Sequence, residues 1–162
     1  MSDREILLNA FAESIHAKAC ALTHPKLTPT GRARLLESIS DDIKKFSNFV
    51  EPEVSQAALE RAASLLVDLR SKGWHEQPQF DPDREVFHWE HVSPVSAIRK
   101  ACIDAPSVVE VADVLRATVR VAWILKDEDR KLTRLGYRSR RADPVAAYAH
   151  AEIVLVPRAD PS

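Results

Sequence analysis

The sequence predicts an α+β fold that is mostly helical, with an N-terminal three-helix segment followed by a small three-stranded sheet with helices. In the first half of the chain, apolar residues recur at steps of three and four, which is the period of an amphipathic helix. In the second half, short apolar or alternating runs are separated by helical stretches with capping residues at their starts. No internal repeat or coiled-coil heptad interrupts this order of elements.

Three helices are expected in the N-terminal segment, residues 1–73. The first keeps its apolar residues on one face and ends before His24. The second begins at Thr28, a capping residue that is followed by proline at the first helical position. The third opens at Glu51 and ends at Gly73, where a basic last turn meets a glycine terminator. Because the joints are short, these helices are expected to form a bundle or a helical arm.

The second half is expected to begin after a linker. Residues 74–84 contain two prolines among polar residues, which is typical of a linker loop. An α+β module is expected at residues 85–157, and a tail at residues 158–162. The expected strands of this module are residues 85–92, 119–125 and 153–156. Its expected helices each begin at or beside a capping residue, namely Ser93, Ser107, Asp127 and Asp143.

Composition excludes several classes of protein. The chain has 162 residues, of which 45% are hydrophobic and 29% charged, enough for one ordinary hydrophobic core. Its start lacks the residue order of a secretory signal, and no apolar stretch approaches the roughly 20 residues that span a bilayer. We therefore expect a cytoplasmic protein that does not associate with a membrane. Cys20 and Cys102 are expected to be buried, reduced thiols, and three glycines are too few for a glycine-rich phosphate loop.

The candidate chemistry lies at Glu90 and His91, at the end of the expected strand 85–92. Neighbouring strand residues project to opposite sides of a sheet unless the strand ends at them. Ser93 and Pro94 follow closely, so the strand is expected to end here. The turn would then bring a carboxylate and an imidazole into one small volume, where an imidazole can accept a proton at neutral pH.

The string Glu90-His91-Val92-Ser93-Pro94 resembles the first motif of the HNH, or His-Me finger, nucleases. In that motif an acidic residue and a histidine precede two residues and a proline. The resemblance, which covers residues 85–135, implies that Glu90 binds a divalent metal and that His91 is the general base for the attacking water. The family's motif closes with a helix that supplies a second ligand, usually histidine or asparagine. With no histidine there, the resemblance implies Asp129, or alternatively Glu128, as a ligand of Mg²⁺ or Mn²⁺.

A basic run follows this acidic helix start. The net charge of the chain is -1, so any attraction to nucleic acid must be local. Between residues 130 and 141 there are six basic residues and no acidic one, and such a segment could hold a phosphate backbone beside a metal site. The expected nucleic-acid contacts are Arg134, Arg138, Arg140 and Arg141.

Each of these patterns also has a purely structural explanation. A Glu-His pair at a strand end commonly just faces solvent or makes a structural hydrogen bond. Acids at residues 127–129 suit a helix start, and a basic run suits a solvated helix end. Two functions therefore remain open. One is a metal-dependent nuclease or its inactive derivative. The other is a non-enzymatic binding or regulatory protein, in phage defence, counter-defence or toxin neutralisation. That protein would act through its N-terminal helices on a protein partner or in a homodimer.

Overall fold

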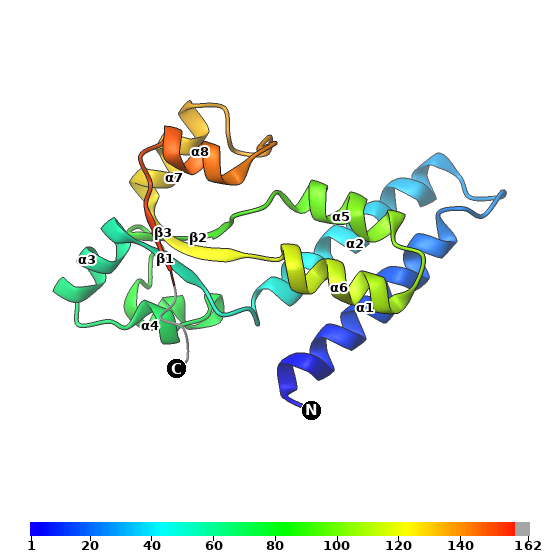
Figure 1. Ribbon diagram of the computed structural model, residues 1–162, viewed down its shortest axis with the longest axis horizontal. Helices are drawn as coiled ribbons and strands as arrows, with labels where there is room; N and C mark the ends of the chain where they lie inside the picture. The colour runs from blue at the N-terminus through cyan, green and yellow to red at the C-terminus, as the bar shows by residue number, and fades with distance from the viewer. Residues whose placement is uncertain (158–162) are drawn as a thin grey trace. The chain divides into compact units, whose positions relative to one another are not determined.

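The computed structural model describes residues 1–157. Within them the chain forms eight α-helices, two 3-10 helices and one four-stranded sheet, so the fold is α+β and mostly helical, as predicted (Figure 1). The elements group into two compact units that interleave in sequence. We call residues 1–49 with 93–119 the helical unit, and residues 50–92 with 120–157 the sheet unit.

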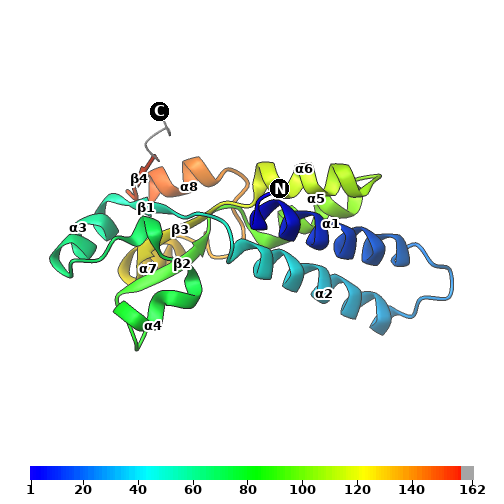
Figure 2. The same ribbon diagram turned by 90° about the horizontal axis from the view of Figure 1, so that it is seen from below.

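The helical unit consists of four helices, namely α1 (Asp3–Ala21), α2 (Pro29–Ser47), α5 (Val95–Asp104) and α6 (Val108–Thr118). Helices α1 and α2 lie side by side, and α1 also packs on α6 (Figure 2). The predicted start of α2 is confirmed, because the Thr28 hydroxyl accepts a hydrogen bond from the Gly31 amide at 3.0 Å. Of the two cysteines expected to be buried, Cys102 is buried but Cys20 is exposed; both are free thiols.

The sheet unit is built on strands in the order β2-β3-β1-β4. Strands β1 and β3 are parallel, and the β2–β3 and β1–β4 pairs are antiparallel. The strands are β1 (Glu53–Ser55), β2 (Phe87–His91), β3 (Val121–Leu125) and β4 (Leu155–Val156). The helices of this unit are α3 (Gln56–Ser64), α4 (Gln77–Phe80), α7 (Lys126–Arg134) and α8 (Pro144–His150), with 3-10 turns at Leu69–Ser71 and Trp74–Glu76.

The two faces of the sheet carry different layers. Figure 1 shows α7 and α8 together on one side of the sheet, where Ala122 and Ile124 of β3 pack with Leu132 and Tyr148. On the other side, the ring of Trp123 contacts those of Phe80 and Trp89. Alternation along β3 therefore divides its side chains between two apolar layers.

The structure corrects the predicted third helix. Its first residues form β1, which pairs with β3, so the sheet has four strands and not three. The helix itself ends at Ser64, because Leu66 takes the left-handed conformation with φ 56° and the chain turns there. The expected linker 74–84 contains a 3-10 turn and α4. The predicted tail, residues 158–162, lies outside the described residues.

Candidate functional site

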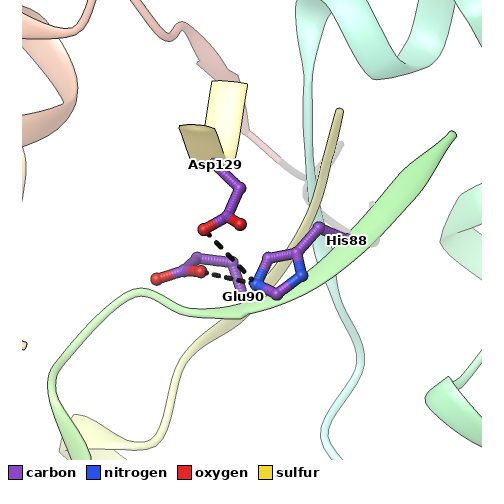
Figure 3. A group of neighbouring side chains, drawn as sticks. All are labelled: His88, Glu90 and Asp129. Carbon is purple, nitrogen blue, oxygen red and sulfur yellow. Dashed lines mark hydrogen bonds and ion pairs between the residues drawn. The ribbon is translucent and has the colours of Figure 1, made fainter. Parts of the chain in front are cut away.

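Three side chains of the sheet unit converge on the face covered by α7. His88 and Glu90 lie two residues apart on β2, so they project from the same face of the sheet, and Asp129 approaches them from α7 (Figure 3). One potential ligand atom from each residue lies within 4.8 Å of the others. The cluster thus joins two elements that are distant in the chain, since Glu90 and Asp129 are 39 positions apart.

The imidazole of His88 lies at the centre of this cluster. Its Nε2 atom is 3.0 Å from Oε2 of Glu90 and 3.7 Å from Oδ1 of Asp129. Its Nδ1 atom is 3.5 Å from the ammonium group of Lys126. Both ring nitrogens therefore face charged groups, and two carboxylate oxygens with one imidazole nitrogen form a donor set that suits a divalent cation.

Arg141 holds Glu90 from the other side. Both side chains are buried, and a guanidinium nitrogen of Arg141 donates a hydrogen bond to Oε1 of Glu90. The same guanidinium donates to the carbonyl oxygens of Tyr137 at 2.6 Å and His91 at 2.8 Å. Burial alone would raise the pKa of Glu90, but the hydrogen bond with His88 and the positive charge of Arg141 outweigh it and lower that pKa. Glu90 is therefore a carboxylate at neutral pH.

The neighbouring acids of α7 have other positions. Glu128 accepts hydrogen bonds from the Leu125 amide at 2.8 Å and from the Ser55 hydroxyl at 2.7 Å. It is thus Glu128, and not Asp127 as expected, that caps the start of α7. The side chain of Asp127 is 85% exposed and pairs with Arg130 at 2.7 Å. Asp129 is the acid of this turn that belongs to the cluster.

The structure brings together two of the three residues predicted for the metal and catalytic site. Glu90 and Asp129 belong to one cluster, as expected. His91 does not, because β2 continues through His91, which is registered with Val121 of β3. As the neighbour of Glu90 in a continuous strand, His91 lies on the opposite face of the sheet. The expected turn that would unite Glu90 with His91 is therefore absent from this part of the described chain.

His88 is the member of the cluster that lies outside the Glu-His-x-x-Pro motif. The two-residue period of the strand nevertheless places it beside Glu90. The motif indicates His91, the histidine next to Glu90, whereas alternation along the strand indicates His88. Strand periodicity is thus the signal in the sequence that identifies His88.

The predicted nucleic-acid contacts divide into two groups. Arg134, Arg138 and Arg140 are exposed, so they remain free to meet a phosphate backbone. Arg141 is placed differently from the expectation, because its guanidinium is buried against Glu90 and the backbone of Tyr137 and His91. In this position it orders the loop after α7 and presents no surface to a nucleic acid.

Comparison with known proteins does not assign the site. The chain matches no model of a protein family, no curated protein and no solved structure. The resemblance to the HNH nucleases therefore stays a prediction that rests on the residues from Glu90 to Pro94. Among the described helices, none combines the length and apolarity needed to cross a bilayer.

Proposed function

We propose that the protein binds a divalent cation through His88, Glu90 and Asp129 and uses it to hydrolyse phosphodiester bonds in nucleic acid. The proposal is supported above all by the approach of the three potential ligand atoms to within 4.8 Å. On an octahedron with bonds of about 2.1 Å, adjacent ligand atoms lie about 3.0 Å apart and opposite ones about 4.2 Å. The separations of His88 Nε2 from Glu90 and Asp129, 3.0 and 3.7 Å, fall in this range.

The charge of the cluster also suits a cation. Glu90 and Asp129 contribute two negative charges, of which the buried guanidinium of Arg141 balances one. The second carboxylate is partly exposed, with 29% of the Asp129 side chain accessible, so a hydrated ion can reach it. A cation held here would lower the pKa of its bound water and supply a hydroxide-like nucleophile at neutral pH.

The basic loop after α7 provides the contact with the substrate. Arg141 ties this loop to Glu90, so the exposed Arg138 and Arg140 belong to a segment that is anchored at the cluster. Phosphate oxygens bound by these arginines would lie beside the cation site. The roles differ from those that the HNH motif implies, because the histidine of this cluster is His88, a cation ligand, whereas the motif implies His91 as a general base.

Titration with Mn²⁺ tests the cation site, and cleavage of single-stranded and duplex DNA and RNA tests the activity. We expect Asp129→Asn to weaken Mn²⁺ binding at least tenfold and to lower cleavage with it, because the charged ligand is lost. Asp127→Asn is the matched control, since it makes the same change in the same turn at a side chain that pairs with Arg130. Binding and cleavage by this control should equal those of the unchanged protein.

Two results would contradict the proposal. One is the absence of saturable Mn²⁺ binding in the unchanged protein. The other is equal cleavage by the Asp129 and Asp127 variants, which would mean that a contaminating nuclease cuts the substrate. Binding without cleavage of any substrate would retain the cation site and reject the phosphodiesterase.

A further inference from the structure

A pocket of about 460 Å³ lies at one end of the sheet, beside α8. It is lined by Val92, which follows β2, by Glu53, the first residue of β1, and by Arg120, which precedes β3. Its walls are mainly apolar and include Val145, Ile153 and Leu155. This volume is within the range of small-molecule sites, which are mostly apolar cavities with a few polar groups that orient the ligand.

The polar part of the pocket is an ion pair with no net charge. Two guanidinium nitrogens of Arg120 donate to the two carboxylate oxygens of Glu53 at 2.7 and 2.9 Å. The side chains of Arg120 and Glu53 are 43% and 20% exposed, so the pair is accessible. A guanidinium has five N–H groups and a carboxylate about four acceptor positions, which leaves donors and acceptors side by side after these two bonds. The pair therefore suits an uncharged ligand edge that carries a donor next to an acceptor.

Tyr148 forms an aromatic part of the wall. Its side chain is buried, and its hydroxyl has no hydrogen-bond partner among the described residues. The guanidinium carbon of Arg141 lies 5.6 Å from the centre of the same ring, so Tyr148 stands between the pocket and the Arg141–Glu90 pair. An aromatic wall favours a flat ring.

We propose that this pocket binds a nucleobase. A purine or pyrimidine is flat, uncharged and apolar on its faces, and its edge carries donors and acceptors next to one another. Those features match the apolar walls, the ring of Tyr148 and the neutral Glu53–Arg120 pair. The inference goes beyond the proposed phosphodiesterase, because a base can bind here without any cation or phosphate.

NMR titration of the full chain tests this inference. Adenosine, guanosine, cytidine and uridine are each added in the presence of EDTA, and the amide signals of the protein are monitored. At least one nucleoside should bind saturably and shift the amide signals of residues that line the pocket. Val145→Trp should weaken that binding at least tenfold, because the indole fills the cavity. Val109→Trp on α6 is the matched control, since both valines are 70% exposed and neither change disturbs a buried side chain.

A second variant tests the role of the buried hydroxyl. Tyr148→Phe should raise the thermal midpoint of the free protein, because it removes a buried polar group that lacks a partner. It should leave nucleoside affinity within about twofold, because the ring that lines the pocket is kept and the buried hydroxyl is not accessible to a ligand.

Several outcomes would overturn the inference. One is the absence of shifts with all four nucleosides, and another is equal nucleoside binding by the Val145 and Val109 variants. A third is that free indole, added as a flat apolar compound, binds the unchanged protein as tightly as the best nucleoside. Nucleoside binding in EDTA by a protein that cuts no nucleic acid would support the pocket and reject only the phosphodiesterase, so the two proposals fail separately.

Discussion

At the scale of single residues, the proton on His88 decides what the cluster can bind. A neutral imidazole has one N–H donor and one acceptor nitrogen. With Lys126 beside Nδ1 and a carboxylate beside Nε2, the favoured form carries the proton on Nε2 and donates it to Glu90. A cation bound at Nε2 would require the proton on Nδ1, where the ammonium of Lys126 opposes it. The charge of Lys126 therefore opposes binding of a cation to His88.

Lys126→Ala should tighten Mn²⁺ binding by about threefold to tenfold, which equals roughly 0.7 to 1.4 kcal/mol. The change removes a positive charge 3.5 Å from the imidazole and frees Nδ1 to carry a proton. Calorimetric titration of the variant with Mn²⁺ measures this effect. Lys131→Ala is the control, because it removes a lysine of the same helix that pairs with Glu152. Weaker binding in the Lys126 variant than in this control would contradict the proposed effect of the Lys126 charge.

The sequence allowed part of this site to be predicted. Glu90 and Asp129 were found from an acidic residue at a strand and an acidic start of a helix, both of which are local signals. Prediction of His88 requires the two-residue period of the strand, because His88 lies outside the motif. Arg141 could not be separated from its exposed neighbours, because only the fold shows that Glu90 lies within reach of its guanidinium.

At the scale of elements, Ser55 belongs both to β1 and to the start of α3, and this overlap hides β1 in the sequence. It is the last residue of β1 and also the cap of α3, since its hydroxyl accepts from the Ala58 amide at 3.1 Å. A strand of three residues is too short to show a two-residue period, so the sequence predicts a helix that already begins at Glu51. The pairing of β1 with β3 is a long-range contact that no local pattern indicates.

The end of α3 provides a test of backbone strain. Leu66 has φ 56° and a side chain that is almost fully exposed, at 95%. For a residue with a side chain this conformation costs roughly 1 kcal/mol, whereas glycine adopts it freely. Leu66→Gly should therefore raise the free energy of unfolding by about 0.5 kcal/mol, after the greater freedom of glycine in the unfolded chain is subtracted. Urea denaturation measures the change.

Leu65→Gly is the matched control for this prediction. Leu65 precedes Leu66 and has an ordinary φ of -99°, so glycine relieves no strain there and should lower the free energy of unfolding by about 1 kcal/mol. The two substitutions have the same chemistry and opposite expected signs. Destabilisation of equal size by both would show that the left-handed conformation of Leu66 carries no strain.

At the scale of the whole molecule, the chain order hides the grouping of the elements. The sequence predicted the class and most helices, because capping residues and apolar periods are local. It predicted a division near residue 73, whereas the two compact units each combine two separate stretches of chain. Packing of α6 on α1 and pairing of β1 with β3 produce that grouping, and both depend on contacts distant in sequence. Binding of a protein partner or a second copy through the N-terminal helices stays a prediction.

The stability of the whole protein should fall in acid. Two buried carboxyls of the sheet unit, Asp81 and Glu90, set the pH range of this loss. The pKa of Asp81 is lowered, because hydrogen bonds from the Phe87 amide and the Gln77 side chain outweigh the opposing effect of burial. The pKa of Glu90 is lowered in the same way by His88 and Arg141. Because folding lowers both values, the folded state binds protons less readily than the unfolded state.

The stabilisation from Asp81 and Glu90 is therefore complete above the ordinary carboxyl range, about pH 4, and is lost as the pH falls through the lower folded values. Urea midpoints measured from pH 7 to pH 2.5 should decline most steeply below about pH 4. Glu90→Gln should flatten this decline, because an amide cannot take up the proton, even though the variant is less stable at every pH with Arg141 unpaired. Glu152→Gln should leave the decline nearly unchanged, since Glu152 also has a lowered pKa but its pair with Lys131 is exposed and screened. An acid decline as steep in Glu90→Gln as in Glu152→Gln would mean that the Arg141–Glu90 pair does not link folding to pH.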